Sequence, residues 1–129
     1  MIIWINGCFD IIHSGHIELF RYARSLGEKL VVGIDTDDRV KTSKGESRPI
    51  NSLEDRVKVV SSIRYVDEVV TFSSDEELLK RIKASQTQLI VVGSDYEGRK
   101  VIGEELVPVT FFRRIPNKSS TKIINEICF

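Results

Sequence analysis

Uninterrupted apolar segments that alternate with helical patterns are the feature that most restricts the fold of this chain. The apolar segments are 2–6, 30–34, 68–72, 89–92 and 107–112. Apolar residues at helical spacing fill three of the intervals, at 14–26, from 51 or 52 to 63 and at 75–84, and they fill the chain end at 119–127. Strands without polar interruption are buried on both faces, which is typical of a parallel sheet covered by helices. We therefore expect an α/β fold, a three-layer sandwich with a five-stranded parallel sheet and helices on both faces.

Size, charge and cysteine usage disfavour several classes of protein. A chain of 129 residues predicts a single domain over 1–129. Its 19 basic and 19 acidic residues cancel, which disfavours a nucleic-acid partner. Cys8 and Cys128 lie at opposite ends and form neither a disulfide framework nor a zinc pattern, so we expect reduced thiols and a cytoplasmic location. The apolar start is too short for a membrane span, and we expect no membrane partner.

Polar and glycine-rich stretches follow the strands, where such sheets bind ligands. In open parallel sheets the ligand lies at the carboxyl ends of the strands, near a reversal of strand order. The stretches that follow strands are 7–16, 35–48, 93–96 and 113–121. Residues 37–50, which overlap the second of these stretches, carry so many polar residues that we expect a loop.

The turn after the first strand carries both histidines of the chain, His13 and His16. A helix starting here offers unpaired N–H groups and a positive dipole end, which attract phosphate. Two imidazoles three residues apart share a face and can donate to phosphate oxygens. A histidine pair alone can also be incidental or bind a metal. The position after a glycine turn favours phosphate, and the absence of GxGxxG and GxxxxGK[ST] disfavours dehydrogenases and P-loop kinases.

This turn resembles the cytidylyltransferase-like superfamily of nucleotidyltransferases, which is marked by an HxGH motif. The matching residues are His13-Ser14-Gly15-His16, preceded by Gly7-Cys8-Phe9-Asp10. The resemblance covers nearly the whole chain and implies a Rossmann-like fold and a homodimer. It implies catalytic roles for His13 and His16 and nucleotide binding by Gly7, Cys8, Phe9 and Gly15. It also implies Mg²⁺ bound through the triphosphate, with no protein residue as a metal ligand.

A cationic stretch, Lys44 to Pro49 (KGESRP), resembles the sugar-phosphate members, notably heptose-1-phosphate adenylyltransferases. Composition alone favours a solvated loop. Its place at the expected binding edge favours a mobile clamp for phosphates, with Lys44 catalytic. The residues that we assign to acceptor binding are Asp10, Asp35, Lys41, Arg48 and Arg56.

Three later segments add to the predicted site. Residues 63–69 are similar to the matching stretch of glycerol-3-phosphate and phosphoethanolamine cytidylyltransferases, and this resemblance implies a catalytic Arg64. Without the resemblance, Arg64 would be interpreted as an ordinary exposed arginine at a helix end. Residues 93–96 resemble the GGDY of sugar-phosphate members. Residues 113–123 fit the family's triphosphate-binding S-[ST]-T-x-[IV] motif, although hydroxyls there can be simple helix caps. The predicted nucleotide-binding residues of these segments are Gly93, Asp95, Arg114, Ser119, Ser120 and Thr121.

Together these features predict transfer of a nucleoside monophosphate from ATP or CTP to a phosphorylated small molecule. An acceptor phosphate oxygen attacks the α-phosphorus and pyrophosphate leaves. The acceptor phosphate is already ionised, so positioning and charge stabilisation suffice. A sugar phosphate such as heptose-1-phosphate is favoured. Three alternatives stay open: a CTP-dependent enzyme for glycerol-3-phosphate or phosphoethanolamine, a phosphopantetheine adenylyltransferase, and a nucleotide-binding module without catalysis.

Overall fold

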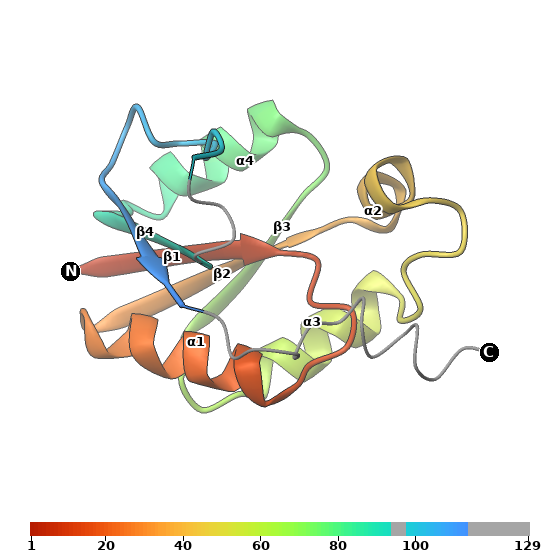
Figure 1. Cartoon of the computed structure of the whole chain (residues 1–129), viewed down its shortest axis with the longest axis horizontal. Coiled ribbons are helices and arrows are strands. Elements are labelled where there is room, and N and C mark those ends of the chain that lie inside the picture. Colours follow the sequence, from red (N-terminus) through yellow and green to blue (C-terminus); the bar gives the residue numbers. More distant parts are fainter. Residues whose placement is uncertain (94–97, 114–129) are drawn as a thin grey trace.

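The computed structural model describes residues 1–93 and 98–113, and strands and helices alternate along most of them (Figure 1). The elements in chain order are β1 (Ile2–Gly7), α1 (Ser14–Ser25), β2 (Lys29–Asp35), α2 (Asp37–Lys44), α3 (Leu53–Ser61), β3 (Glu68–Phe72), α4 (Asp75–Ala84), β4 (Leu89–Gly93) and β5 (Val109–Phe112). All five predicted strands are present. The predicted closing helix, 119–127, lies outside the described residues.

The five strands form one parallel sheet in the order β3-β2-β1-β4-β5. The chain moves outward from β1 through β2 to β3 and then returns to the other side of β1 with β4. The strand order therefore reverses between β1 and β4, and a crevice at that reversal is where such sheets bind ligands. The carboxyl ends of β1 and β2 point to the right in Figure 1, toward α2 and the segment before α3.

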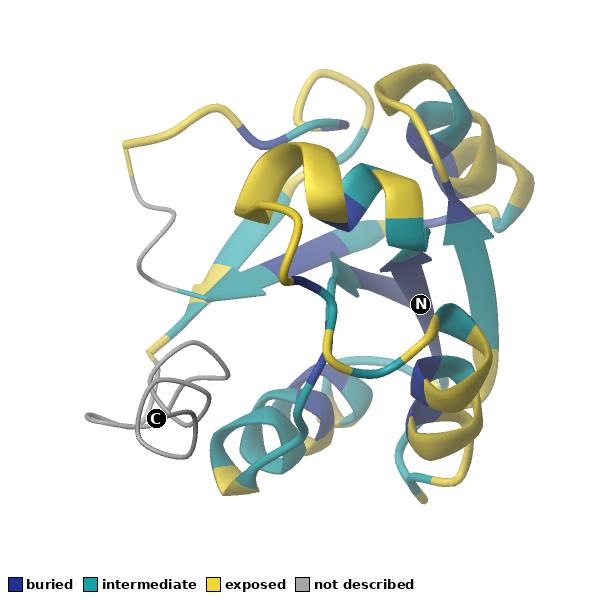
Figure 2. Cartoon of the chain, turned by 90° about the vertical axis from the view of Figure 1, so that its right-hand side faces the viewer, coloured by how far each residue is buried: buried dark blue, intermediate teal, exposed yellow. Residues whose placement is uncertain are grey.

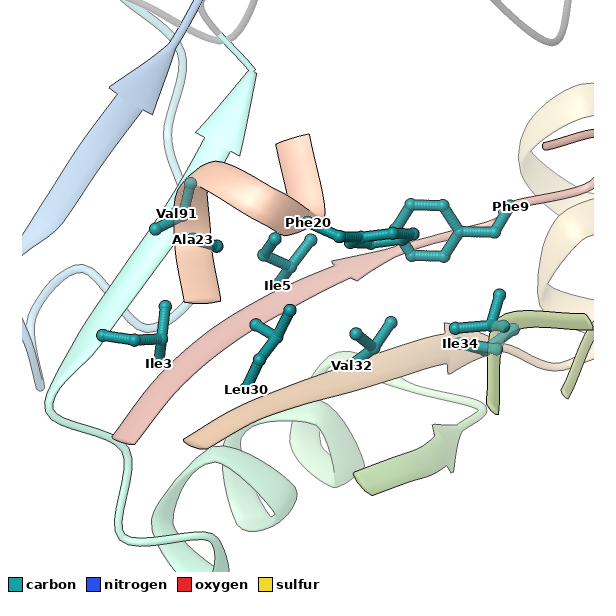
Figure 3. Close-up of a cluster of buried hydrophobic side chains, with 10 residues drawn as sticks. Ile3, Ile5, Phe9, Phe20, Ala23, Leu30, Val32, Ile34 and Val91 are labelled. Atoms are coloured by element: carbon teal, nitrogen blue, oxygen red, sulfur yellow. The ribbon is translucent and has the colours of Figure 1, made fainter. Parts of the chain in front are cut away.

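Helices cover both faces of the sheet, which confirms the predicted three-layer sandwich. On one face α1 and α3 cover a cluster of buried side chains that includes Ile5, Phe20 and Val32 (Figure 3). On the other face α4 and residues 101–109 cover a second cluster around Trp4 and Ile90. Buried positions concentrate in the strands, whereas outward helix faces are exposed (Figure 2). Within residues 1–93 and 98–113, no helix is long and apolar enough to cross a membrane.

Gly33 on β2 lets the side chains of Trp4 and Phe72 pack closely over the backbone of that strand, within the second cluster. A Cβ atom at Gly33 would lie 2.6 Å from Cζ2 of Trp4 and 3.2 Å from Cε1 of Phe72. The Trp4 ring is fully buried, and its Nε1 donates to Oδ1 of Asn6 over 2.8 Å. The indole therefore occupies the space that any larger residue at position 33 would need.

The expectation of a loop over 37–50 was wrong for its first half, because Asp37–Lys44 forms α2. Only Val40 of this helix is buried, so the sequence shows no apolar periodicity there. Charge favours the helix instead: Asp37 and Asp38 occupy its first turn, and Lys41 and Lys44 its last. Acidic residues at the N-terminus and basic residues at the C-terminus stabilise the helix dipole.

Candidate active site

The two histidines cap the N-terminus of α1 reciprocally. The N–H of Gly15 donates to Nδ1 of His13 over 3.0 Å, and the N–H of His13 donates to Nδ1 of His16 over 3.2 Å. The two rings lie 3.9 Å apart between centroids. An accepting Nδ1 must be unprotonated, so each neutral ring carries its proton on Nε2. The cap therefore fixes the tautomer and places the proton of each neutral ring on Nε2.

The electrostatics of this helix end suit an anion. The first turn of α1 contains no acidic residue. The dipole end and the two imidazole donors therefore act with the same sign, and no carboxylate in that turn opposes them. The arrangement can bind phosphate and can stabilise negative charge that develops on it.

Phe9 packs against His16. The centroid of its ring lies 5.6 Å from that of His16, in an edge-to-face arrangement, and 5.2 Å from that of Phe20. Phe9 has a positive φ of 51°, and a Cβ at Gly7 would lie 3.1 Å from its Cζ atom. Gly7 and Phe9 thus shape the turn, and Phe9 is buried beside His16 rather than exposed for the predicted contact with nucleotide.

Asp10 binds the segment before α3 instead of facing solvent. Its carboxylate accepts from the N–H groups of Ile50 (2.8 Å) and Asn51 (2.9 Å) and from Nε of Arg48 (3.2 Å). The side chain of Asp10 is fully buried and that of Arg48 is 10% exposed. The prediction that Asp10 and Arg48 contact the acceptor is corrected, because each occupies the other in a buried ion pair.

Arg56 is also buried and lies beneath the site. Its Nη1 donates to the carbonyl oxygens of Cys8 (2.9 Å) and Asp35 (2.8 Å). Its Nη2 donates to Oδ1 of Asp37 (2.7 Å), and its Nε to the carbonyl oxygen of Asn51 (3.1 Å). The guanidinium therefore joins the carboxyl ends of β1 and β2 to the start of α2, at Asp37, and to the end of the loop that follows α2, at Asn51. This correction replaces the predicted acceptor contact of Arg56 with a structural one.

Asp35 pairs with Arg39 at the end of β2. The Nε of Arg39 lies 2.7 Å from Oδ1 of Asp35, and Nη2 of Arg39 lies 2.7 Å from Oδ1 of Asp75. Burial raises the pKa of the Asp35 carboxyl above its ordinary value, and the nearby charges of Arg39, Arg56 and Lys44 oppose that rise. The prediction that Asp35 meets the acceptor stays a prediction.

Lys44, the last residue of α2, lies close enough to act on this group of residues. Burial raises the pKa of the Cys8 thiol above its ordinary value, and the positive charges of Arg56 and Lys44 partly oppose that rise. Both Lys41 and Lys44 are exposed. Lys44 is thus an exposed lysine whose positive charge influences groups at the carboxyl ends of β1 and β2.

The remaining predicted residues fall into three groups. Gly93 ends β4 at the carboxyl edge of the sheet, and β4 is the neighbour of β1. Arg64 precedes β3, where the N–H of Asp67 donates to the carbonyl oxygen of Leu30 near the start of β2. It therefore lies at the amino edge of the sheet, opposite the edge that carries the histidines, which does not fit the predicted catalytic role beside them. The third group of predicted site residues lies outside the part of the chain that the structure describes: Asp95, Arg114, Ser119, Ser120 and Thr121.

Sequence reasoning missed Asp37, Arg39 and Asn51, which hold the site together. Asn51 donates from Nδ2 to the carbonyl oxygen of Asp10 over 2.7 Å, while Ser52 caps α3. A signal was present for Asp37 and Arg39, because both lie just after β2 in a stretch rich in charged residues of both signs. Nothing in the sequence pairs them with partners far along the chain.

Comparison with known proteins agrees with this geometry. The family model described as cytidylyltransferase-like matches residues 4–126. The bifunctional protein HldE of Campylobacter fetus is 42% identical over 97% of this chain, and that of Helicobacter hepaticus is 40% identical over 98%. The chain spans 27% and 26% of the length of these relatives. A lipopolysaccharide core biosynthesis protein of Thermoplasma volcanium shares the fold, with a TM-score of 0.69 and 23% identity over 89% of this chain and 96% of that one.

Proposed function

This chain belongs to the cytidylyltransferase-like family of nucleotidyltransferases, and we propose that it transfers AMP from ATP to the phosphate of a sugar phosphate. The observation that carries the proposal is the reciprocal histidine cap at the switch point of the sheet. It presents two imidazole N–H donors at a helix N-terminus, which is the chemistry that a triphosphate requires.

The reaction that we propose is an in-line displacement at phosphorus. An oxygen of the acceptor phosphate forms a bond to the α-phosphorus, and the bond to the bridging oxygen of pyrophosphate breaks. The electron pair leaves with pyrophosphate, so no proton has to be removed from the attacking phosphate dianion. His13 and His16 donate from Nε2 to the oxygens on which charge develops, and Lys44 adds a positive charge from the end of α2.

Magnesium enters this proposal with the nucleotide. The residues around the histidine cap offer N–H and ammonium groups, which bind phosphate oxygens and not a cation. Two carboxylates at this edge of the sheet are already paired, Asp10 with Arg48 and Asp37 with Arg56. We therefore propose that Mg²⁺ would be held through the triphosphate and would supply positive charge against the leaving pyrophosphate.

Support for a sugar phosphate comes from the segment that contains Lys44. The KGESRP stretch resembles sugar-phosphate adenylyltransferases, and the curated relatives named above are bifunctional HldE proteins. Support for a CTP-dependent alternative rests on the stretch around Arg64, which lies at the amino edge of the sheet, away from the histidines. We therefore propose ATP as the nucleotide and a sugar 1-phosphate such as heptose-1-phosphate as the acceptor.

The test is pyrophosphate release with Mg²⁺ in a grid of ATP and CTP against four acceptors. These are heptose-1-phosphate, glycerol-3-phosphate, phosphoethanolamine and phosphopantetheine. We expect release with ATP and heptose-1-phosphate, and its loss in His16→Asn. Asparagine keeps an oxygen acceptor near the place of Nδ1 but removes the Nε2 donor, so the helix cap survives while the proposed chemistry does not.

Other outcomes reassign the function. Release with CTP and glycerol-3-phosphate or phosphoethanolamine would move the chain to that branch. No release in any mixture, together with a nucleotide-dependent rise in melting temperature, would indicate a binding module. Release that survives in His16→Asn would contradict the proposed role of the histidine cap.

A further inference from the structure

Residues 37–51 form a continuous strap across the carboxyl ends of β1 and β2, and the strap is anchored at both ends. It consists of α2 and the loop that leads to α3 (Figure 1). Its first residue, Asp37, binds Nη2 of Arg56 over 2.7 Å, and its last residue, Asn51, accepts from Nε of the same guanidinium over 3.1 Å. One buried side chain therefore holds both ends of a 15-residue segment.

The far end of the strap has a second buried anchor. The carboxylate of Asp10 accepts from Arg48, from the N–H of Ile50 and from the N–H of Asn51. Asp10 stands only three residues before His13, in the turn that carries the histidines. The same carboxylate thus fixes the end of the strap to the histidine turn.

The middle of the strap is exposed, in contrast to its anchors. Residues 41–47 are all exposed, and a Cβ at Gly45 would meet nothing within 4 Å. This middle carries Lys44, whose charge acts on Cys8 and Asp35 at the ends of β1 and β2. The strap thus combines an accessible cationic middle with ends that are held by the buried side chains of Arg56 and Asp10.

We propose that Asp10 and Arg56 are positioning residues that hold Lys44 at the carboxyl ends of β1 and β2 by anchoring the two ends of the strap. They touch no substrate and act through the placement of Lys44. The proposal rests on the function proposed above for its catalytic consequence, but the anchoring itself is a property of the folded chain. A misplacement of about 1 Å in a catalytic group costs roughly a hundredfold in rate, so anchoring of this kind matters for turnover.

The first test releases one anchor at a time and measures tryptic cleavage of the native protein after Lys44. Asp37→Ala removes the ion pair at the first end, and Asp10→Asn removes the charge and one acceptor at the last end. The matched controls are Asp38→Ala, in the same helical turn, and Glu46→Gln, in the same loop; both residues are exposed. Cleavage of a native chain follows local opening, so release of the strap speeds it.

We expect cleavage after Lys44 to rise about tenfold in both anchor variants, to rise far less in Asp38→Ala, which removes the same first-turn charge without an ion pair, and to stay at the wild-type rate in Glu46→Gln. Cleavage after Lys100, an exposed residue on another segment, serves as the internal reference. An unchanged rate after Lys44 would overturn the proposal. So would an equal rise after Lys44 and Lys100, because that result indicates general loosening. If Asp10→Asn fails to fold, Asp37→Ala decides, since the Asp37 side chain is 42% exposed.

The second test links anchoring to turnover through a double-mutant cycle with Lys44→Ala. We expect Asp37→Ala to lower kcat/KM about tenfold in the wild-type background and far less when Lys44 is already absent. Equal losses in both backgrounds would overturn the link to Lys44. If the wild-type chain releases no pyrophosphate, the proposed function fails and the cleavage test alone decides whether the strap is anchored as proposed.

Discussion

His13 caps α1 and also carries a proposed chemical role, and three substitutions separate the two. His13→Asn keeps an oxygen that can accept from the N–H of Gly15, but it removes the Nε2 donor. His13→Gln keeps a side-chain N–H at about the reach of Nε2 and gives up the cap. His13→Ala removes both. The 3.0 Å bond from Gly15 to Nδ1 is the cap at stake.

The magnitudes follow from one capping bond and one donor. Loss of a side-chain cap costs about 1 kcal/mol, whereas asparagine is among the best capping residues, so His13→Asn should match wild type. Loss of one donor to a developing anion costs roughly a hundredfold to a thousandfold in kcat. We therefore expect His13→Ala to lose stability and activity, His13→Asn activity alone, and His13→Gln about 1 kcal/mol of stability with part of the activity retained.

Urea denaturation and pyrophosphate release under the same buffer conditions check this prediction. A loss of 1 kcal/mol in a chain of this size lowers the melting temperature by about 4 °C, which calorimetry resolves. If His13→Asn turns over at the wild-type rate, His13 is a helix cap and no more. If His13→Ala is as stable as wild type, the reciprocal cap contributes nothing measurable.

Three further predictions concern stability. Gly33→Ala should cost about 1–3 kcal/mol, because its Cβ would lie 2.6 Å from the Trp4 ring, and urea midpoints should fall accordingly; an unchanged midpoint would show that the indole can move. Arg56→Met should lower the free energy of unfolding by about 3 kcal/mol or more, because it leaves two strand-end carbonyl oxygens without their donor. Denaturation should show this loss against the matched control Arg64→Met, which should be near neutral. Burial raises the pKa of Asp35, so its protonated form favours the folded state, and the stability of wild type relative to Asp35→Asn should fall as the pH rises from about 4 to about 7. A relative stability that increases over this range would show that the pair with Arg39 outweighs burial.

The fold was largely predictable because its strands are apolar on both faces. β1 and β2 contain uninterrupted buried runs, and the helices α1 and α4 show one apolar face each. α2 was not predictable in this way, since Val40 is its one buried residue. Charge at the two helix ends stabilises it, and that pattern is weaker than periodicity and easily read as a polar loop.

The candidate site was predictable where a local motif fixes the geometry, as at His13 and His16. It was not predictable where a charged residue makes its contacts far along the chain. Asp10 and Arg48 are 38 residues apart, and Arg56 reaches Cys8 across 48 residues. A sequence shows each as a charge at a ligand-binding edge, and only the fold shows that these charges are buried. Arg64 was misplaced for a simpler reason, because it precedes a strand and so lies at the opposite edge.

The buried indole on β1 gives this chain a built-in optical reporter. Trp4 is its single tryptophan, so the fluorescence emission has one source. The ring is shielded from water and its N–H is held by Asn6, the residue just before the end of β1. Emission at short wavelength in the native state should therefore shift to the red when β1 leaves the sheet. A single spectral trace can then distinguish loss of the central strand from local release of the strap, which leaves the indole in place.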